Sequence, residues 1–124
     1  KFKFRLFRII KINKLGLNLT WICYPMHGNT STSKSGYKTR ATENLFKEIQ
    51  SYFEIHKSEG SVAGGVHLEL TGLDVTECVG GPDDIKDENL GDRYHTFCDP
   101  RLNVNQSLEL SFLLADLLSN GEMN

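Results

Sequence analysis

The sequence lacks any long run of apolar residues and any segment built like a secretory leader. No stretch approaches the roughly 18 apolar residues that a membrane-spanning helix needs. The apolar residues near the N-terminus are interrupted by charge at short intervals, and no small-residue cleavage site follows them. These absences predict a soluble protein that is neither inserted in a membrane nor secreted.

Cysteine is scarce, and its spacing excludes two classes of small protein. There are three cysteines, an odd number, and no two of them form a CxxC pair: Cys23, Cys78 and Cys98. A disulfide scaffold needs paired cysteines, and zinc-finger or dithiol redox motifs need closely spaced ones. We therefore expect a protein of a reducing, intracellular compartment.

Acidic residues are absent from residues 1–14, although that segment holds six basic ones. The remainder carries 8 of the 14 basic residues and all 16 acidic ones, so the net charge of −2 combines +6 and −8. A basic segment joined to an acidic body is one pattern of an arm that binds nucleic acid or a membrane. The alternative is a packed helix, because Phe2, Leu6 and Ile9 recur at helical spacing. We predict the helix, ending near Gly16, and with it no nucleic-acid or membrane partner.

A length of 124 residues suits one domain, and 39% hydrophobic residues suffice for a modest core. Apolar periodicity and turn residues divide the chain into alternating helices and strands. We expect, in order, a helix over 1–16, a strand over 17–23, a loop over 26–41, a helix over 42–56 capped by Thr42, a strand over 64–72, a short helical turn over 74–78, a surface loop over 80–84, a strand over 94–98, and a helix capped by Asn103 and ended by Asn120-Gly121. Strands separated by crossovers of this length run parallel, so the expected fold class is α/β, as an open sheet or a barrel.

Three of the expected strands end near a potential metal ligand that is followed by glycine or proline: His27, Glu69 and Asp99. The carboxyl ends of parallel strands lie at one edge of a sheet, so we expect these side chains to lie close together. One imidazole and two carboxylates suit Mn²⁺, Fe²⁺, Co²⁺ or Zn²⁺ better than Mg²⁺. Spacing alone leaves open the alternative that these residues are structural or solvated.

Three longer motifs carry a family resemblance: WxCxPMHGNT, GGVHLExTGxxVTEC and RYHTxCDPRLNxxQSLEL. In this order and at this spacing they resemble the carboxy-terminal part of the class II (plant-type) 3-deoxy-D-arabino-heptulosonate 7-phosphate (DAHP) synthases. The resemblance covers about Leu17 to Leu118, and the family protein is several times longer, so the chain looks like a fragment. It implies that residues 1–124 form about the last three strand-helix units of a (β/α)8 TIM barrel, with the active site at the carboxyl ends of the strands.

The resemblance also implies an activity and a metal site. The family condenses phosphoenolpyruvate with erythrose 4-phosphate, releases phosphate, and so begins the shikimate pathway to chorismate and the aromatic amino acids. By motif, His27, Glu69 and Asp99 match the ligands of the family's divalent metal, with Mn²⁺ expected first and Co²⁺, Fe²⁺ or Zn²⁺ as alternatives. The family's fourth ligand is a cysteine outside this chain. Lys38 and Arg40, which match the family's GxKTR, are expected phosphate contacts.

The resemblance implies further properties of the whole protein. It implies a homo-oligomer in the full-length family, and a cytoplasmic location, or a plastid one in a photosynthetic eukaryote. Arg101 follows the turn after Asp99, so we expect it to brace that strand end rather than to bind substrate.

One residue departs from the family pattern, and it motivates a second hypothesis. Tyr24 stands where the family has Asp in WxCDPMHGNT, which replaces a carboxylate near the metal with a bulkier phenol. We expect weak metal binding and no activity from the fragment alone. The alternatives are a degenerate, non-catalytic fragment, or a small binding module that acts through residues 1–14.

Overall fold

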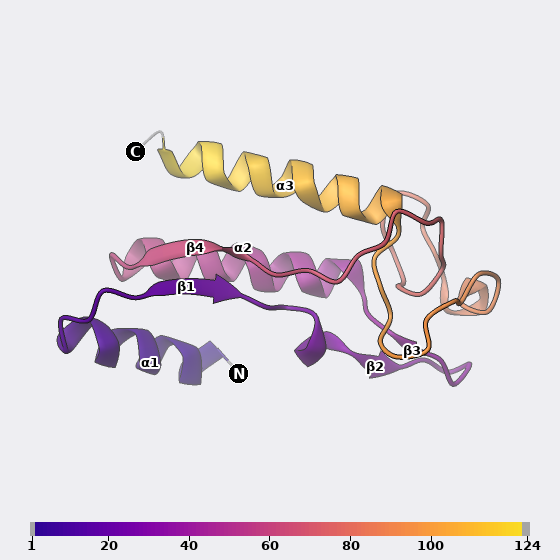
Figure 1. The fold of residues 1–124 in the computed structure, drawn as a ribbon, viewed down its shortest axis with the longest axis horizontal. Helices are drawn as coiled ribbons and strands as arrows, with labels where there is room; N and C mark the ends of the chain where they lie inside the picture. The colour runs from indigo at the N-terminus through magenta and orange to yellow at the C-terminus, as the bar shows by residue number, and fades with distance from the viewer. Residues whose placement is uncertain (1, 123–124) are drawn as a thin grey trace.

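The computed structural model describes residues 2–122. Its elements are α1 (Phe2–Lys14), β1 (Thr20–Cys23), the 3₁₀ turn η1 (His27–Asn29), β2 (Ser31–Thr32), β3 (Lys38–Thr39), α2 (Thr42–Ser58), β4 (Val62–Val66), the 3₁₀ turn η2 (Asp87–Asn89) and α3 (Val104–Glu122). Figure 1 shows β2, β3 and the loops of the second half of the chain gathered at the end to which β1 points. None of the helices in this described range is both long and apolar enough to cross a membrane.

β1 and β4 form a parallel two-stranded sheet, with α2 as part of the crossover between them (Figure 1). The two strands pair along their lengths, with one irregularity after Trp21. Gly64 allows this pairing, because a Cβ there would lie 2.1 Å from Thr20 Cγ2 and 2.9 Å from the Trp21 carbonyl oxygen. The parallel order confirms the α/β class predicted from the crossover length.

The predicted N-terminal helix is present as α1. Gly16 follows it with a φ of 65°, and the Gly16 N–H donates to the Asn13 carbonyl, so the chain turns where the sequence predicted. Ile9 is only 4% exposed and lines the same pocket as Trp21 of β1. The side chains of Phe2 and Leu6, which belong to the same predicted stripe, lie outside the described part of the chain.

The core lies between the sheet and helices α2 and α3. Its buried members come from the end of β1, from both helices and from the loops between them: Cys23, Met26, Leu45, Ile49, Tyr52, Cys78, Leu102 and Leu110. The apolar spacing of α2 is therefore confirmed, but its predicted cap is wrong: Ala41 is the N-cap residue and Thr42 is the first helical residue. The Thr42 N–H donates to the Val79 carbonyl, so a neighbouring segment, not a side-chain cap, satisfies it.

Asn103 caps the start of α3, as predicted, and Val104 is the first helical residue. The Gln106 N–H donates to Asn103 Oδ1 at 2.9 Å, and the Asn103 N–H donates to Gln106 Oε1 at 3.1 Å. This reciprocal pair satisfies two backbone donors at the start of the helix. The predicted stop at Asn120-Gly121 is wrong, because α3 continues to Glu122.

The predicted strand over 94–98 is wrong, and so is a single strand over 64–72. Residues 94–98 form a loop, since the backbone N–H groups of His95 and Thr96 donate to the carboxylate of Glu77 rather than to a neighbouring strand. β4 ends at Val66, and within residues 67–72 Leu70 alone makes a bridge, a parallel one to Leu102. Residues 94–98 make no such bridge, and between them and the start of α3 the chain pairs only at Leu102.

The helical turn predicted over 74–78 is also absent. These residues form no regular secondary structure, and their backbone groups bond to other segments. The Thr76 N–H donates to the Arg93 carbonyl, and the Glu77 carbonyl accepts from Thr39 Oγ1. The segment therefore links β3 to the loop over 94–98.

We expect the isolated chain to self-associate, because its sheet leaves apolar side chains uncovered. Leu19, Ile22 and Val62 are 47%, 57% and 62% exposed, and Phe97 is fully exposed. A strand edge with exposed apolar residues favours association. In sedimentation velocity the average mass should rise with concentration, and a double Ile22→Lys, Val62→Lys variant should reduce that rise. The control Gln50→Lys, on an exposed face of α2, should not, and a parent that stays monomeric at all concentrations would contradict the expectation.

Candidate active site

The residues predicted to bind metal and phosphate lie at the carboxyl end of the β1–β4 sheet. β1 leads through the buried Pro25 and Met26 to His27, the first residue of η1. Glu69 lies three residues beyond the end of β4, and Asp99 lies in the loop that replaces the third predicted strand. An open cleft links the two carboxylates; it is lined by Leu68, Glu69, Leu70, Thr96, Cys98, Asp99 and Arg101.

Arg40 joins the three segments that carry the predicted ligands. Its side chain has no exposure to solvent. Nη1 donates to Glu69 Oε2 at 2.6 Å and to the carbonyl of Pro100, the residue after Asp99. Nε donates to Thr30 Oγ1 at 3.0 Å, at the end of the η1 turn. The remaining nitrogen, Nη2, is buried and makes no hydrogen bond within the described residues.

Glu69 is held through both carboxylate oxygens. Tyr24 donates its hydroxyl proton to Oε1, while Arg40 occupies Oε2. Burial alone would raise the pKa of Glu69, but the hydrogen bonds from Tyr24 and Arg40 outweigh it and the pKa lies below its ordinary value. The same hydrogen bond raises the pKa of Tyr24, since it stabilises the neutral phenol. Glu69 is therefore a carboxylate, and Tyr24 is its donor.

Asp99 lies between two basic side chains at the surface. Its Oδ2 is 3.9 Å from His27 Nδ1, and its Oδ1 is 3.6 Å from Lys38 Nζ. His27 and Lys38 are 77% and 60% exposed, whereas Asp99 is 27% exposed. Both separations exceed a hydrogen bond, so neither contact fixes the exposed side chains of His27 and Lys38 in place.

The donor chemistry of these residues fits a divalent cation. Asp99 and Glu69 supply carboxylate oxygens, each of which can accept a hydrogen bond and also ligate a cation, and His27 supplies an imidazole nitrogen. Within residues 2–122, however, no three His, Cys, Asp or Glu side chains come close enough to hold an ion together. Glu69 is paired with Tyr24 and Arg40, and Asp99 faces His27 and Lys38.

Glu77 belongs to the framework of the site, although it was not among the residues selected from the sequence. It has no exposure, and Arg101 donates to it from its backbone N–H and from its guanidinium at 2.8 to 3.1 Å. Arg101 therefore braces the loop, as predicted. Burial alone would raise the pKa of Glu77, but the hydrogen bonds from Arg101 and His95 outweigh it and the pKa lies below its ordinary value. Two signals could have found it: an acid inside a mostly apolar run, and its place in the motif GGVHLExTGxxVTEC.

The three cysteines lie outside any disulfide; Cys23 and Cys78 are buried, and Cys98 is exposed beside Asp99. Two of them contact the loop that carries Asp99: Cys78 Sγ donates to the Arg101 carbonyl at 3.4 Å, and the Cys98 N–H donates to Thr96 Oγ1. Burial raises the pKa of Cys78 to about 12, so it remains a thiol. His67 and His95 are both exposed, and His67 meets the Tyr24 ring edge-on at 5.2 Å.

Comparison with known proteins agrees with the motifs. Residues 3–115 match the Class-II DAHP synthetase family. The chain is 52% identical over 110 residues to a phospho-2-dehydro-3-deoxyheptonate aldolase of Mycolicibacterium smegmatis, covering 89% of this chain and 24% of that protein. It is also 52% identical over 107 residues to a protein of that name from Streptomyces coelicolor, covering 86% and 24%. The chain thus spans about a quarter of the length of these relatives.

Proposed function

Because the chain belongs to the class-II DAHP synthetase family, we propose that it forms the carboxy-terminal part of a (β/α)8 barrel enzyme. That enzyme condenses phosphoenolpyruvate with erythrose 4-phosphate and releases phosphate, as the first step of the shikimate pathway. The observation that carries the proposal is the convergence of the segments bearing His27, Glu69 and Asp99 on the buried guanidinium of Arg40. This quarter of the enzyme alone supplies no complete site and is proposed to be inactive.

His27, Glu69 and Asp99 would hold the divalent metal, with Mn²⁺ as the first choice and Co²⁺, Fe²⁺ or Zn²⁺ as alternatives. When bound, such an ion supplies a Lewis acid at the aldehyde oxygen of erythrose 4-phosphate. The carboxylates of Glu69 and Asp99 neutralise the ion's charge, and the imidazole of His27 provides the nitrogen donor. A fourth ligand, a cysteine, lies outside this chain by resemblance to the family.

Lys38 and Arg40 are the proposed phosphate contacts. Lys38 is exposed at the rim of the cleft and faces Asp99 through space, so its ammonium is free to turn toward an anion. Arg40 is buried, and two of its nitrogens are occupied by protein oxygens, so only Nη2 has an unused donor. We assign Lys38 the larger share of phosphate binding on this ground.

A second candidate function is a degenerate, non-catalytic fragment. The hydrogen bond from Tyr24 to Glu69 favours it, because a phenol in place of the family's Asp lies against one of the carboxylate oxygens proposed to bind the metal. The third hypothesis, a binding module acting through residues 1–14, has less support. Ile9 of α1 is buried against the protein, as expected of a packed helix rather than of a free arm.

The proposal includes properties that belong to the whole protein. We propose a homo-oligomeric, intracellular enzyme, following the family resemblance, with no nucleic-acid or membrane partner. Both relatives reported above are bacterial, which gives no support to the plastid alternative.

The test is a full-length chimera, in which residues 1–124 replace the matching quarter of the Mycolicibacterium smegmatis relative. Glu69→Ala should weaken Mn²⁺ binding, measured by electron paramagnetic resonance, by well over the 10- to 100-fold typical of residues that only orient a ligand. Phosphate release from phosphoenolpyruvate should fall with it. Asp116→Asn, an exposed carboxylate of α3, is the control and should leave both unchanged. A Glu69→Ala chimera with parental binding and turnover would refute the site assignment, and a parent chimera without Mn²⁺ binding would favour the degenerate fragment.

A further inference from the structure

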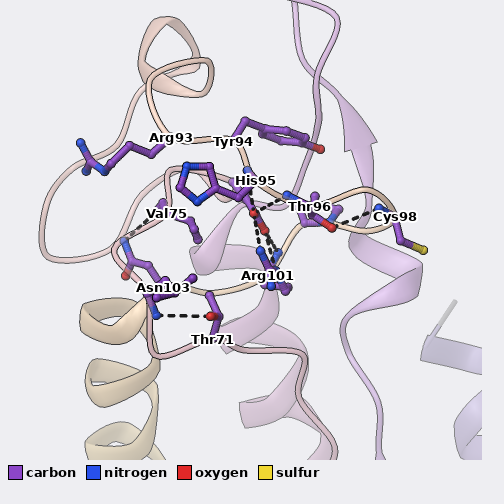
Figure 2. Close-up of polar contacts among 12 residues, drawn as sticks. Thr71, Val75, Arg93, Tyr94, His95, Thr96, Cys98, Arg101 and Asn103 are labelled. Atoms are coloured by element: carbon purple, nitrogen blue, oxygen red, sulfur yellow. Dashed lines mark hydrogen bonds and ion pairs between the residues drawn. The ribbon is translucent and has the colours of Figure 1, made fainter.

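The carboxylate of Glu77 collects five hydrogen bonds from one loop, although it is fully buried. Oε1 accepts from the backbone N–H groups of His95 and Thr96 at 3.1 and 2.8 Å, and from Arg101 Nη2 at 2.9 Å. Oε2 accepts from the Arg101 N–H at 2.8 Å and from Arg101 Nε at 3.1 Å. Figure 2 shows these bonds as dashed lines gathered between the backbone of His95 and Thr96 and the side chain of Arg101.

The backbone donors lie on both sides of Asp99. His95 and Thr96 precede it and Arg101 follows it, so one carboxylate fixes both ends of the loop that carries it. The loop is further stiffened inside, because Thr96 Oγ1 donates to the Asp99 carbonyl at 2.9 Å and accepts from the Cys98 N–H at 3.1 Å. Asp99 therefore has a defined place without any strand around it.

Glu77 is itself attached to the rest of the fold through its neighbours. Its own carbonyl accepts from Thr39 Oγ1 of β3 at 2.9 Å. The carbonyl of Cys78, the next residue, accepts from Gln106 Nε2 of α3 at 3.0 Å. Glu77 is thus attached to β3 through its own carbonyl and to α3 through the next residue. The positions of β3 and α3 therefore determine where Glu77 holds the Asp99 loop.

Stability alone is a weak reason for a carboxylate here. Burying a charge is costly, and replacing a buried ion pair by apolar residues is often neutral or stabilising. An apolar side chain, however, cannot gather backbone N–H groups from both sides of Asp99. The geometry that Glu77 provides is what an apolar replacement would lose.

We propose that Glu77 is a positioning residue that sets the orientation of Asp99 in the active site. The inference rests on the proposed function, in which Asp99 is a metal ligand. Glu77 touches neither metal nor substrate in this proposal and acts through the loop over 95–101.

The experiment compares two isosteric variants of neighbouring buried residues in the full-length chimera. Glu77→Gln replaces one acceptor oxygen with an amide that faces N–H donors. Thr76→Val is the matched control, because it removes bonds to the Leu90 carbonyl and the Arg93 N–H but leaves the Asp99 loop untouched. Mn²⁺ affinity is measured by electron paramagnetic resonance, and hydrogen exchange of residues 97–99 is measured without metal. If Glu77→Gln does not fold, Glu77→Asp, which keeps the charge but shortens its reach, replaces it.

We expect the Glu77 variant to bind Mn²⁺ about 10- to 100-fold more weakly and to exchange faster at residues 97–99, while Thr76→Val stays within about threefold of the parent. Unchanged Mn²⁺ affinity in a folded Glu77 variant, or an equal loss in Thr76→Val, would overturn the proposal. If Asp99→Asn binds Mn²⁺ as the parent does, the proposed function fails instead. In that case the hydrogen exchange of residues 97–99 in the metal-free Glu77 variant still tests the inference. Faster exchange than in the parent supports positioning of the loop by Glu77, and exchange at the parental rate overturns it.

Discussion

Arg40→Met in the full-length chimera is expected to lower the free energy of unfolding by about 3 kcal/mol. Methionine fills much of the same volume, so the change mainly removes a buried cation. Glu69 then keeps only Tyr24 as a partner, and the Pro100 carbonyl and the Thr30 hydroxyl lose their donor. We place the loss at the lower end of the 3–5 kcal/mol typical of a broken buried pair, because Glu69 retains 26% exposure.

Denaturant unfolding measures this loss of stability, and two further variants serve as comparisons. Arg40→Lys keeps the charge but has a single ammonium, which cannot reproduce the planar fork that reaches three segments, so it should recover only part of the stability. Lys47→Met breaks an exposed i,i+4 pair with Glu43, which solvent screens, so its unfolding midpoint should stay close to that of the parent. An Arg40→Met midpoint equal to that of Lys47→Met would show that Arg40 does not hold the segments together.

Gly64→Ala is the second substitution with a large expected effect, about 2 kcal/mol or more of lost stability. The new Cβ would lie 2.1 Å from Thr20 Cγ2, which can rotate, and 2.9 Å from the Trp21 carbonyl oxygen, which cannot move without separating β1 from β4. Close packing gives the chain no spare space at this point.

Thermal unfolding of the chimera checks the Gly64 prediction, with Gly72→Ala as the matched control. A Cβ at Gly72 meets nothing within 4 Å, so that variant should unfold near the parental temperature. Adding Thr20→Ser to Gly64→Ala removes the Cγ2 clash and should restore only part of the loss, since the carbonyl remains. Full recovery in the double variant would mean that the backbone contact carries no cost.

Periodicity predicted the helices well because their apolar stripes are local. The α2 stripe, with Leu45, Ile49 and Tyr52 buried, follows from residue spacing alone, as does the Asn103 cap of α3. Residue spacing could not show that residues 94–98 form a loop instead of the predicted strand. Its N–H groups are taken by Glu77, about twenty residues earlier, and no local pattern reports such a long-range acceptor.

In the candidate site, too, local motifs could be read from the sequence, whereas long-range contacts could not. The motifs selected His27, Glu69 and Asp99, and the structure brings their segments to one end of the sheet. The burial of Arg40 could not be predicted, because a basic residue in a polar loop is usually solvated. The pairing of Tyr24 with Glu69 also depends on two segments that are 45 positions apart in the chain.

The three contacts of Arg40 also bear on the order in which the chain assembles. They span 10 residues to Thr30, 29 to Glu69 and 60 to Pro100. Closing a longer loop costs more chain entropy, and folds dominated by distant contacts form slowly. During synthesis from the N-terminus, the guanidinium therefore meets Thr30 first and the Asp99 loop last. A ribosome must pass Pro100 before the charge of Arg40 is fully enclosed, so the end of the sheet that carries His27, Glu69 and Asp99 is among the last parts to acquire its final geometry.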